Sequence, residues 1–328
     1  MATEPGGASG GAPPGTLIGA RYRIEAVLGR GGMGAVYRVR DERKRCAVAL
    51  KQLHGAARNG TTGALVTSQF EREYHTLCQL AHPSIIEVYD YGVDDSGAFY
   101  TMELLDGEDL RERGRLAWRE ACAVLRDVAS SLAIIHSRGL LHRDISARNV
   151  RCTAAGNAKL IDFGAMTAMG LCRHVVGTPP FVPPEALQLQ ALDGRSDLYA
   201  LGALAYSVLT GRHPYPARTF GELRDHWRNL PGKPRRYQPD VPEALDQLVM
   251  ELIELDRSAR PKSAAEVMER LSGIAGLALR ELPEVSRAYL VAPMLIEHDE
   301  PLAAVRAKLV QAVHLTSPRN LRSLHCRP

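Results

Sequence analysis

The first hundred residues place apolar and polar side chains in short alternating runs separated by glycine and charged residues. Five runs show the period of two that half-buried strands have, at 21–30, 34–41, 46–53, 84–93 and 98–105. A turn-forming sequence, Asp-Asp-Ser-Gly, lies between the last two runs. The pattern predicts an antiparallel sheet of five strands in this part of the chain.

Between the third and fourth runs the period changes to that of an amphipathic helix. Four apolar residues share one face of this helix: Phe70, Tyr74, Leu77 and Leu80. Ser68 followed by Glu71 resembles a capping box, so we expect the helix to begin near Ser68. One helix is therefore predicted to interrupt the sheet.

From residue 118 the chain becomes mainly helical. An apolar stripe ends at 138–139, where arginine and glycine form a basic last turn and a stop. The stripe consists of Ala121, Val124, Leu125, Val128, Leu132 and Ile135. Helical periodicity returns at 198–209, 243–255 and 263–273, with proline-rich loops between these segments.

Together these patterns predict an α+β fold with two lobes. The first lobe, at 20–105, is an antiparallel five-stranded sheet with one helix, and the second, at 106–275, is mainly α-helical. Residues 1–19 are rich in glycine and proline, which is typical of a flexible leader. Residues 276–328 form a tail, in which 302–313 has the pattern of an amphipathic docking helix.

Composition limits the kinds of partner that the chain is expected to bind and the compartment in which it is expected to act. The net charge of +4 over 328 residues is too small to indicate nucleic-acid binding. The 6 cysteines are dispersed, which favours reduced thiols in the cytoplasm over a disulfide framework or a zinc site. The most apolar stretch, at 198–209, is shorter than the roughly 18–20 residues that span a bilayer, so we expect no membrane span.

Three glycines, Gly29, Gly31 and Gly34, form the pattern G-x-G-x-x-G. Backbone amides in such a loop can approach phosphate groups closely because glycine has no Cβ. A dinucleotide-binding fold would need a helix after the last glycine, whereas 35–39 continues as a strand. The pattern therefore favours a strand–loop–strand flap over the phosphates of a nucleotide.

The strand at 46–53 places Ala49 and Lys51 on one face, so that a small residue would cover a base beside a cation. A lysine at a strand end is usually solvated, and a functional Lys51 therefore needs a carboxylate partner. Two carboxylates of the predicted helix compete for this role, Glu71 and Glu73. The spacing from Phe70 favours Glu73.

Two motifs in the second lobe are more specific. Residues 142–149 read His-Arg-Asp-Ile-Ser-Ala-Arg-Asn, and residues 162–164 read Asp-Phe-Gly. Phosphoryl transfer needs a carboxylate that orients the acceptor, ligands for Mg²⁺ and cations that absorb charge. The chain supplies such a set as Asp144, Asn149, Asp162 and Lys51. In the order and spacing of these motifs, the chain resembles bacterial eukaryotic-like serine/threonine protein kinases over roughly 20–275.

The resemblance implies an enzyme that transfers the γ-phosphoryl group of ATP to serine or threonine hydroxyls of protein substrates, itself included. It implies Mg²⁺ as the metal, with Mn²⁺ as the alternative, and a dimer as the arrangement for autophosphorylation in trans. The catalytic residues that it implies are Asp144, Lys51, Arg148 and Asn149, and the metal ligands are Asn149 and Asp162. The nucleotide-binding residues that it implies are Leu28, Gly29, Gly31, Gly34, Val36, Ala49, Lys51, Glu73, Met102, Glu103, Leu105, Asp109 and Arg151.

Within the resemblance, Met102 is similar to the gatekeeper, Glu103 and Leu105 would offer backbone groups to adenine, and Asp109 would meet the ribose. Residues 177–185 resemble the end of an activation segment. A spine joining the lobes would consist of Leu77, Val88, His142 and Phe163. The structural positions that bear on this segment are Asp197, Gly202 and Arg260, of which Arg260 is expected to pair with Glu185.

Two positions depart from the family pattern. Serine/threonine kinases usually have lysine two residues after Asp144, but this chain has Ser146 there and places its cation at Arg148, as tyrosine kinases do. This leaves dual specificity open. Arg151 stands where the family generally has an apolar residue under the adenine.

These departures favour one alternative, a pseudokinase scaffold that binds nucleotide with little or no turnover. Retention of the complete phosphoryl-transfer set argues for the enzyme, because a scaffold has no need of it. A small-molecule phosphotransferase is the third alternative. For regulation, the hypothesis is that Thr167 is phosphorylated and that Arg143 binds the phosphate.

Overall fold

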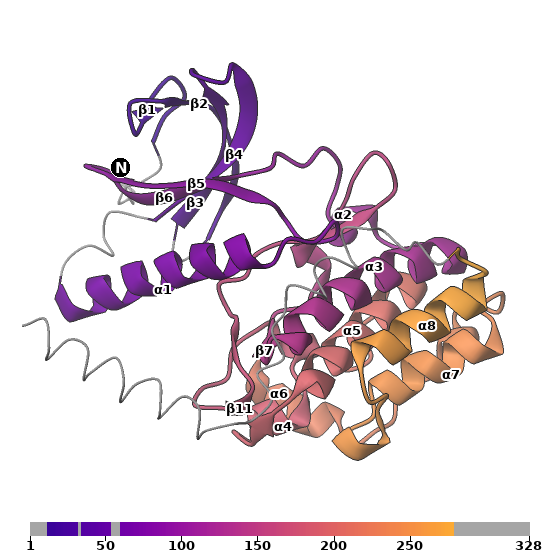
Figure 1. Ribbon diagram of the computed structural model, residues 1–328. Helices are drawn as coiled ribbons and strands as arrows, with labels where there is room; N and C mark the ends of the chain where they lie inside the picture. Colours follow the sequence, from indigo (N-terminus) through magenta and orange to yellow (C-terminus); the bar gives the residue numbers. More distant parts are fainter. Residues whose placement is uncertain (1–11, 32–33, 54–59, 279–328) are drawn as a thin grey trace, which may run out of the picture. The chain divides into compact units, whose positions relative to one another are not determined.

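The structure, a computed structural model, describes residues 12–31, 34–53 and 60–278, which belong to one compact unit. Strands predominate before residue 103 and helices after it (Figure 1). The strands are β1 Leu17–Ile18, β2 Tyr22–Arg30, β3 Gly34–Asp41, β4 Cys46–Leu53, β5 Val88–Asp94, β6 Gly97–Met102, β7 Leu140–Leu141, β8 Val150–Cys152, β9 Ala158–Leu160, β10 Thr167–Ala168, β11 Gly170–Leu171 and β12 Ala191–Leu192. The helices are α1 Gly60–Gln79, α2 Leu110–Arg113, α3 Trp118–Ser137, α4 Pro184–Leu187, α5 Gly194–Thr210, α6 Phe220–His226, α7 Glu243–Leu252 and α8 Ala264–Ala275, and the 3₁₀ turns are η2 Ala147–Asn149, η3 Pro179–Phe181, η4 Pro234–Arg236 and η5 Arg257–Ala259.

The sheet of the first lobe is antiparallel, with the strand order β1-β2-β3-β4-β6-β5. It has six strands where five were expected. The additional strand, β1, lies in the segment 1–19 that was predicted to be a flexible leader, and Ile18 is buried in the core of the lobe. A strand of two residues is too short to show a period of two, so the sequence pattern could not reveal it.

The helix of the first lobe, α1, packs against β5 and β6 (Figure 1). Its apolar face is the predicted one, since Phe70, Leu77 and Leu80 are buried. The predicted start was wrong, because α1 begins at Gly60 and Ser68 lies in its interior. The segment 60–67 contains glycine and threonine, which have low helix propensity, so this part of the helix has no clear sequence signal.

The fourth predicted strand also begins later than expected. Residues 84–87 precede β5, and Ile85 forms a parallel bridge with Leu160 of the second lobe. The amide of Ile86 donates a hydrogen bond to the carbonyl of Leu160 at 3.1 Å. Strand-like residues in this stretch therefore connect the two lobes instead of extending the sheet.

In the second lobe, α3 is the central helix, and α5 and α8 pack against it (Figure 1). Every residue of the predicted apolar stripe is buried. The predicted helices at 198–209, 243–255 and 263–273 correspond to α5, α7 and α8, with ends shifted by a few residues. One apolar core runs from the α1 face of the first lobe into the helical lobe.

The expected docking helix at 302–313 lies outside the described residues. Of the helices within the described ranges, none combines the length and apolar character that a bilayer crossing requires.

His82 lies in the buried connection between α1 and β5 and contacts α3. Its Nδ1 accepts a hydrogen bond from the amide of Ser84 at 3.1 Å, and its Nε2 lies 3.1 Å from Ser130 Oγ. Nδ1 can accept only when it carries no proton, so this geometry requires a neutral ring. Burial, together with the charge of Lys159, lowers the pKa of His82 from 6.5 to about 4.

Protonation of His82 therefore favours the unfolded chain, in which the pKa is higher. The contribution of His82 to stability is complete above pH 6.5 and is lost as the pH falls towards about 4. We expect the free energy of unfolding to be about 2 kcal/mol smaller at pH 5 than at pH 7 because of the protonation of His82. Urea unfolding at pH 7 and pH 5 should show that the free energy of unfolding decreases less for His82→Gln than for the wild type. Equal decreases in the two proteins would contradict the assignment.

Candidate active site

Lys51 of β4 lies between carboxylates from both lobes. Its Nζ is 2.8 Å from Glu73 Oε1 on α1 and 3.2 Å from Asp162 Oδ1 in the second lobe. Glu73 is the partner that the spacing from Phe70 favoured. The competing carboxylate, Glu71, is exposed and pairs with His75. The strand, the helix and the Asp-Phe-Gly motif thus converge on one ammonium group.

The charges of Lys51, Glu73 and Asp162 stabilise one another. Burial by itself would lower the pKa of Lys51, but the negative charges of Glu73 and Asp162 raise it well above its ordinary value. Burial would raise the pKa of Asp162, but the charge and hydrogen bond of Lys51 lower it below its ordinary value. Burial also raises the pKa of Tyr100, so its hydroxyl stays protonated and donates to Glu73 Oε1 at 3.0 Å.

The loop that carries Asp144 is held by a buried carboxylate of α5. Asp197 accepts hydrogen bonds from the amides of His142 and Arg143, both at 2.9 Å, and lies 2.9 Å from His136 Nε2. Arg143 adopts a φ of 68°, which is unfavourable for a residue with a Cβ. Burial alone would raise the pKa of Asp197, but the hydrogen bond and charge of His136 lower it, so Asp197 remains an anion that can hold this loop.

Asp144 and Asn149 lie side by side at the end of this loop. Asn149 Nδ2 donates to Asp144 Oδ2 at 2.9 Å and to the carbonyl of Asp144 at 2.8 Å. Among the hydrogen bonds of the described residues, none involves Asn149 Oδ1. This oxygen is therefore available as a ligand.

Arg148 occupies the space beside Asp144 where a phosphate would need a cation. One guanidinium nitrogen lies 3.6 Å from Asp144 Oδ2 and donates to Thr178 Oγ1 at 3.1 Å. The Thr178 hydroxyl donates in turn to Asp144 Oδ1 at 3.2 Å. Ser146 is buried, and its hydroxyl has no partner among the described residues. The cation at this position therefore comes from Arg148 and not from residue 146.

The glycine-rich loop connects β2 and β3. A Cβ at Gly34 would lie 2.1 Å from the carbonyl oxygen of Gln52, so only glycine fits there. Gly29 and Gly31 have open space around them, and Leu28 is exposed beside them. Residues 32–33 of this loop lie outside the described residues. On the next strands, Val36 pairs with Lys51, and Ala49 pairs with Met102.

Met102 ends β6, and the segment after it passes between the lobes. The amide of Glu103 donates to the carbonyl of Glu87 at 2.9 Å, and its Oε1 accepts from Lys159 Nζ of β9 at 2.5 Å. Within the described part of the chain, the carbonyl of Glu103 and the backbone amide of Leu105 make no hydrogen bond. The resemblance expects backbone groups of these two residues to meet adenine, and this contact stays a prediction.

The side chains of Arg151 and Asp109 both form hydrogen bonds with groups of the protein. Arg151 donates to the carbonyl of Gly107 at 2.6 Å, while its Nε is buried without a partner among the described residues. Asp109 is buried and caps α2, because its Oδ1 accepts from the amides of Arg111 and Glu112, both at 2.9 Å. The carboxylate of Asp109 is therefore occupied by the helix in this structure, and a ribose contact for it stays a prediction.

The residues of the expected spine lie in the shared core. Leu77, His142 and Phe163 are buried, Val88 packs against the same core, and the rings of His142 and Phe163 are 4.9 Å apart. Two residues of the site, Tyr100 and Lys159, had no place in the sequence reasoning, which considered Thr178 only as part of the segment 177–185. The period of two along β6 places Tyr100 on the side of Met102, which is the signal that could have identified it.

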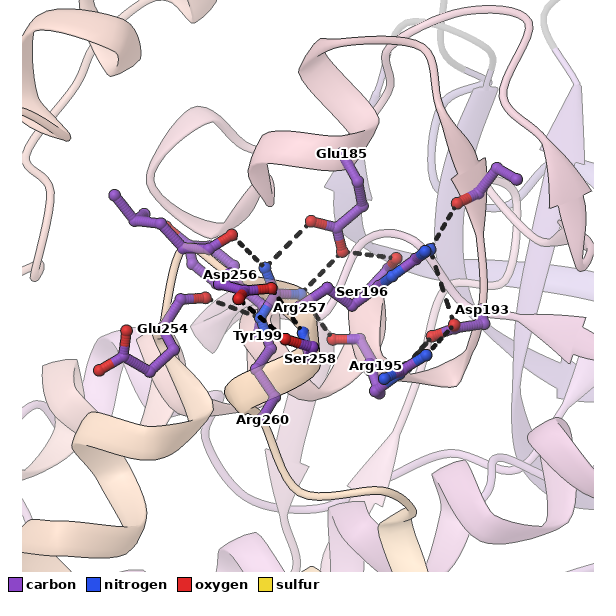
Figure 2. A network of polar contacts seen from close by, with 12 residues as sticks. Glu185, Asp193, Arg195, Ser196, Tyr199, Glu254, Asp256, Arg257, Ser258 and Arg260 are labelled. Atoms are coloured by element: carbon purple, nitrogen blue, oxygen red, sulfur yellow. Dashed lines mark hydrogen bonds and ion pairs between the residues drawn. The ribbon is translucent and has the colours of Figure 1, made fainter.

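The end of the activation segment, which we define as residues 162–185, is fixed by a buried ion pair (Figure 2). Arg260 donates to Glu185 Oε1 at 2.7 Å and to Oε2 at 3.0 Å, as the sequence predicted. Ser196 Oγ donates to Glu185 Oε1 at 2.8 Å, and Arg260 also reaches the carbonyls of Arg195 and Glu254. The guanidinium group of Arg260 is thus held by the carboxylate of Glu185 and by main-chain carbonyls.

Comparison with known proteins gives consistent matches. A profile of the protein kinase domain matches residues 22–271. A probable serine/threonine-protein kinase of Streptomyces coelicolor is 34% identical over 267 residues, covering 76% of this chain and 39% of that protein. A DNA damage-responsive serine/threonine-protein kinase of Deinococcus radiodurans is 33% identical over 285 residues, covering 82% and 41%. The chain thus spans about two fifths of the length of these relatives.

Breaking the buried pair should be far more costly than breaking an exposed one. Arg260→Met leaves the carboxylate of Glu185 buried without its cation, which we expect to lower the free energy of unfolding by about 3–5 kcal/mol. The matched control is Arg270→Met, which removes a partly exposed pair with Glu251 and should cost less than about 1 kcal/mol. Urea unfolding of both variants checks this, and similar midpoints would show that the pair does not brace the segment.

Proposed function

The chain belongs to the protein kinase family, and from that premise we propose that it transfers the γ-phosphoryl group of Mg·ATP to serine and threonine hydroxyls of proteins, itself included. The observation that carries the proposal is the position of Lys51 between Glu73 and Asp162, at 2.8 and 3.2 Å. Phosphoryl transfer depends on positioning and charge stabilisation, and this pairing brings the required groups of both lobes together.

The residues present fit Mg²⁺ bound together with ATP. Asp162 offers a carboxylate and Asn149 a free amide oxygen, which suits a small cation that keeps several waters and takes other oxygens from phosphates. Among the described residues no cluster of three or more His, Cys, Asp or Glu forms a complete protein cage for a metal. Bound in this way, the metal would neutralise phosphate charge. Mn²⁺ is the alternative.

In the proposed reaction, the acceptor oxygen forms a bond to the γ-phosphorus as the bond to the bridging oxygen of ADP breaks. Asp144 orients the acceptor hydroxyl and takes its proton as the bond forms. Lys51 holds the phosphates on the leaving side. Arg148, 3.6 Å from Asp144, neutralises the transferring group in place of the lysine that the family usually has at position 146.

We further propose that the protein acts in the cytoplasm on protein substrates, with a second copy of the chain as a substrate in trans. The cysteines among the described residues are free thiols, which supports a reducing compartment. Similarity to proteins named serine/threonine kinases supports acceptors of that type. The absence of nucleic acid among the partners stays a prediction from the small net charge.

The first test is autophosphorylation of the purified chain with labelled Mg·ATP beside Asp144→Asn. We expect the variant to lose activity by about 10²–10⁴-fold, because the group that takes the proton is removed. Phosphoamino-acid analysis should give phosphoserine or phosphothreonine, whereas phosphotyrosine would indicate dual specificity. No label from the wild type, with nucleotide binding retained, would support the scaffold alternative.

The choice of carboxylate partner for Lys51 can be tested separately. Glu73→Gln removes the buried negative charge that Lys51 pairs with and leaves only a neutral acceptor, so we expect kcat/KM for ATP to fall about ten- to hundredfold. The matched control on the same helix is Glu71→Gln, which changes an exposed residue and should leave kcat/KM within about twofold. Equal losses in the two variants would contradict the assigned pair.

A further inference from the structure

Positive charge is concentrated in one stretch of the second lobe, between α5 and α7. Residues 211–238 contain seven Lys or Arg residues and two Asp or Glu residues, an excess of five positive charges. The whole chain has a net charge of only +4. The rest of the chain is therefore close to neutral, and the positive charge has a defined place on the protein.

Four of these seven cations are exposed and form no salt bridge with any described residue. The other three each lie beside a carboxylate, as the pairs Arg218–Glu222, Arg228–Asp225 and Arg235–Glu243. We call the four unpaired cations the basic surface, and they are Arg212, Arg224, Lys233 and Arg236. Because no neighbouring carboxylate offsets their charge, these side chains are available to an anionic partner.

Two tyrosines of α5 bring together the segments that carry the basic surface. Tyr199 and Tyr206 are seven residues apart, which places them on one face of α5. Trp227, directly after α6, donates to the hydroxyl of Tyr199 at 3.3 Å, and Tyr206 donates to the carbonyl of Gly232 at 2.7 Å. The helix α6 and the loop that follows it therefore lie along the same face of α5.

The loop that follows α5 adds Arg212 to this arrangement. The guanidinium carbon of Arg212 lies 5.0 Å from the centroid of the Tyr237 ring. A Cβ at Gly232 would lie 3.3 Å from Arg236 Cδ, so Arg236 lies beside the loop that Tyr206 binds. Burial raises the pKa of Tyr206, whereas the charges of Arg212 and Arg236 act in the opposite direction. Both cations therefore lie close to the same pair of tyrosines.

The basic surface begins next to the place where an acceptor hydroxyl would lie. His213 follows Arg212 in the chain, and its ring packs edge-on against Phe181 with the centroids 5.4 Å apart. Phe181 ends η3, which directly follows Thr178, and the hydroxyl of Thr178 donates to Asp144 at 3.2 Å. The helix α6 packs against η3 as well. The cations are therefore continuous with the surface around Asp144.

We propose that the basic surface binds an acidic segment of the protein substrate close to the acceptor residue, so that the kinase is selective for acidic substrates. The proposal rests on the proposed kinase function and names the substrate class of that site. Electrostatic complementarity of this kind selects partners and speeds their association. An acidic protein segment is favoured over a nucleic acid or a lipid surface, because the cations adjoin the place where a protein hydroxyl is held for transfer.

Binding is tested with the full chain and two fluorescent peptides, in which one threonine is flanked either by glutamates or by glutamines. We expect the glutamate peptide to bind at least about tenfold more tightly, and this difference to shrink as the ionic strength rises from about 0.05 to about 0.5 M. Arg212→Gln combined with Arg236→Gln should weaken binding of the glutamate peptide at least about fivefold. The matched control, Arg40→Gln combined with Arg43→Gln, removes two exposed arginines of the first lobe and should change the affinity by less than about twofold. Equal affinities of the wild type for the two peptides would overturn the proposal.

Phosphorylation of the same peptides is the second readout. The wild type should have a kcat/KM at least about tenfold higher for the glutamate peptide, through a lower KM for the peptide. Arg212→Glu combined with Arg236→Glu should instead prefer a peptide in which lysines flank the threonine, a gain that a misfolded variant cannot produce. If the wild type autophosphorylates but does not distinguish the glutamate and glutamine peptides, the inference is overturned and the proposed function stands. Anionic lipid vesicles that bind through the same two arginines, together with that result, would assign the basic surface to a membrane.

Discussion

The buried carboxylate of Asp197 is the constraint from which the geometry of the active site follows. It binds two consecutive amides of the loop that carries Asp144, and it holds Arg143 in a conformation that a side chain with a Cβ adopts only under restraint. A charged acceptor is better suited to this than a neutral one, because charge-assisted hydrogen bonds are stronger. From this one anchor, Asp144 faces Thr178 and Arg143 faces His174.

The departures from the family pattern are compensated by neighbouring groups. Ser146 supplies no cation, and Arg148, two residues further on in the 3₁₀ turn η2, brings its guanidinium to 3.6 Å from Asp144 Oδ2. Arg151 would place a charge under the adenine, but it bonds the carbonyl of Gly107 and leaves its aliphatic stem for packing. On the paired strand, Lys159 binds Glu103 at the other end of the same interlobe segment. Two cations of one hairpin thus fix the segment that would bind adenine.

The sequence predicted the parts of the structure in which pattern and function coincide. The apolar stripe of α3 and the partner of Lys51 follow from spacing, and the Glu185–Arg260 pair follows from the resemblance to the family. The failures lie where tertiary contacts decide. β1 is too short to show a period, α1 extends through residues of low helix propensity, and Ile85 leaves the sheet to bridge Leu160. The engagement of Arg143 had no sequence signal, since its partner is a backbone carbonyl.

The connection between α1 and β5 explains how both lobes contribute to one site. Glu73 lies on α1, whose carboxyl end leads into residues 80–87, and there the amide of Ile86 is bonded to Leu160. Leu160 lies two residues before Asp162, so Glu73 and Asp162 are tied to the same buried strand end. A lobe movement that bends the segment after Met102 would shift the glycine-rich loop relative to the second lobe, but it would leave this connection in place. The carboxylates on both sides of Lys51 are therefore positioned by the same buried core.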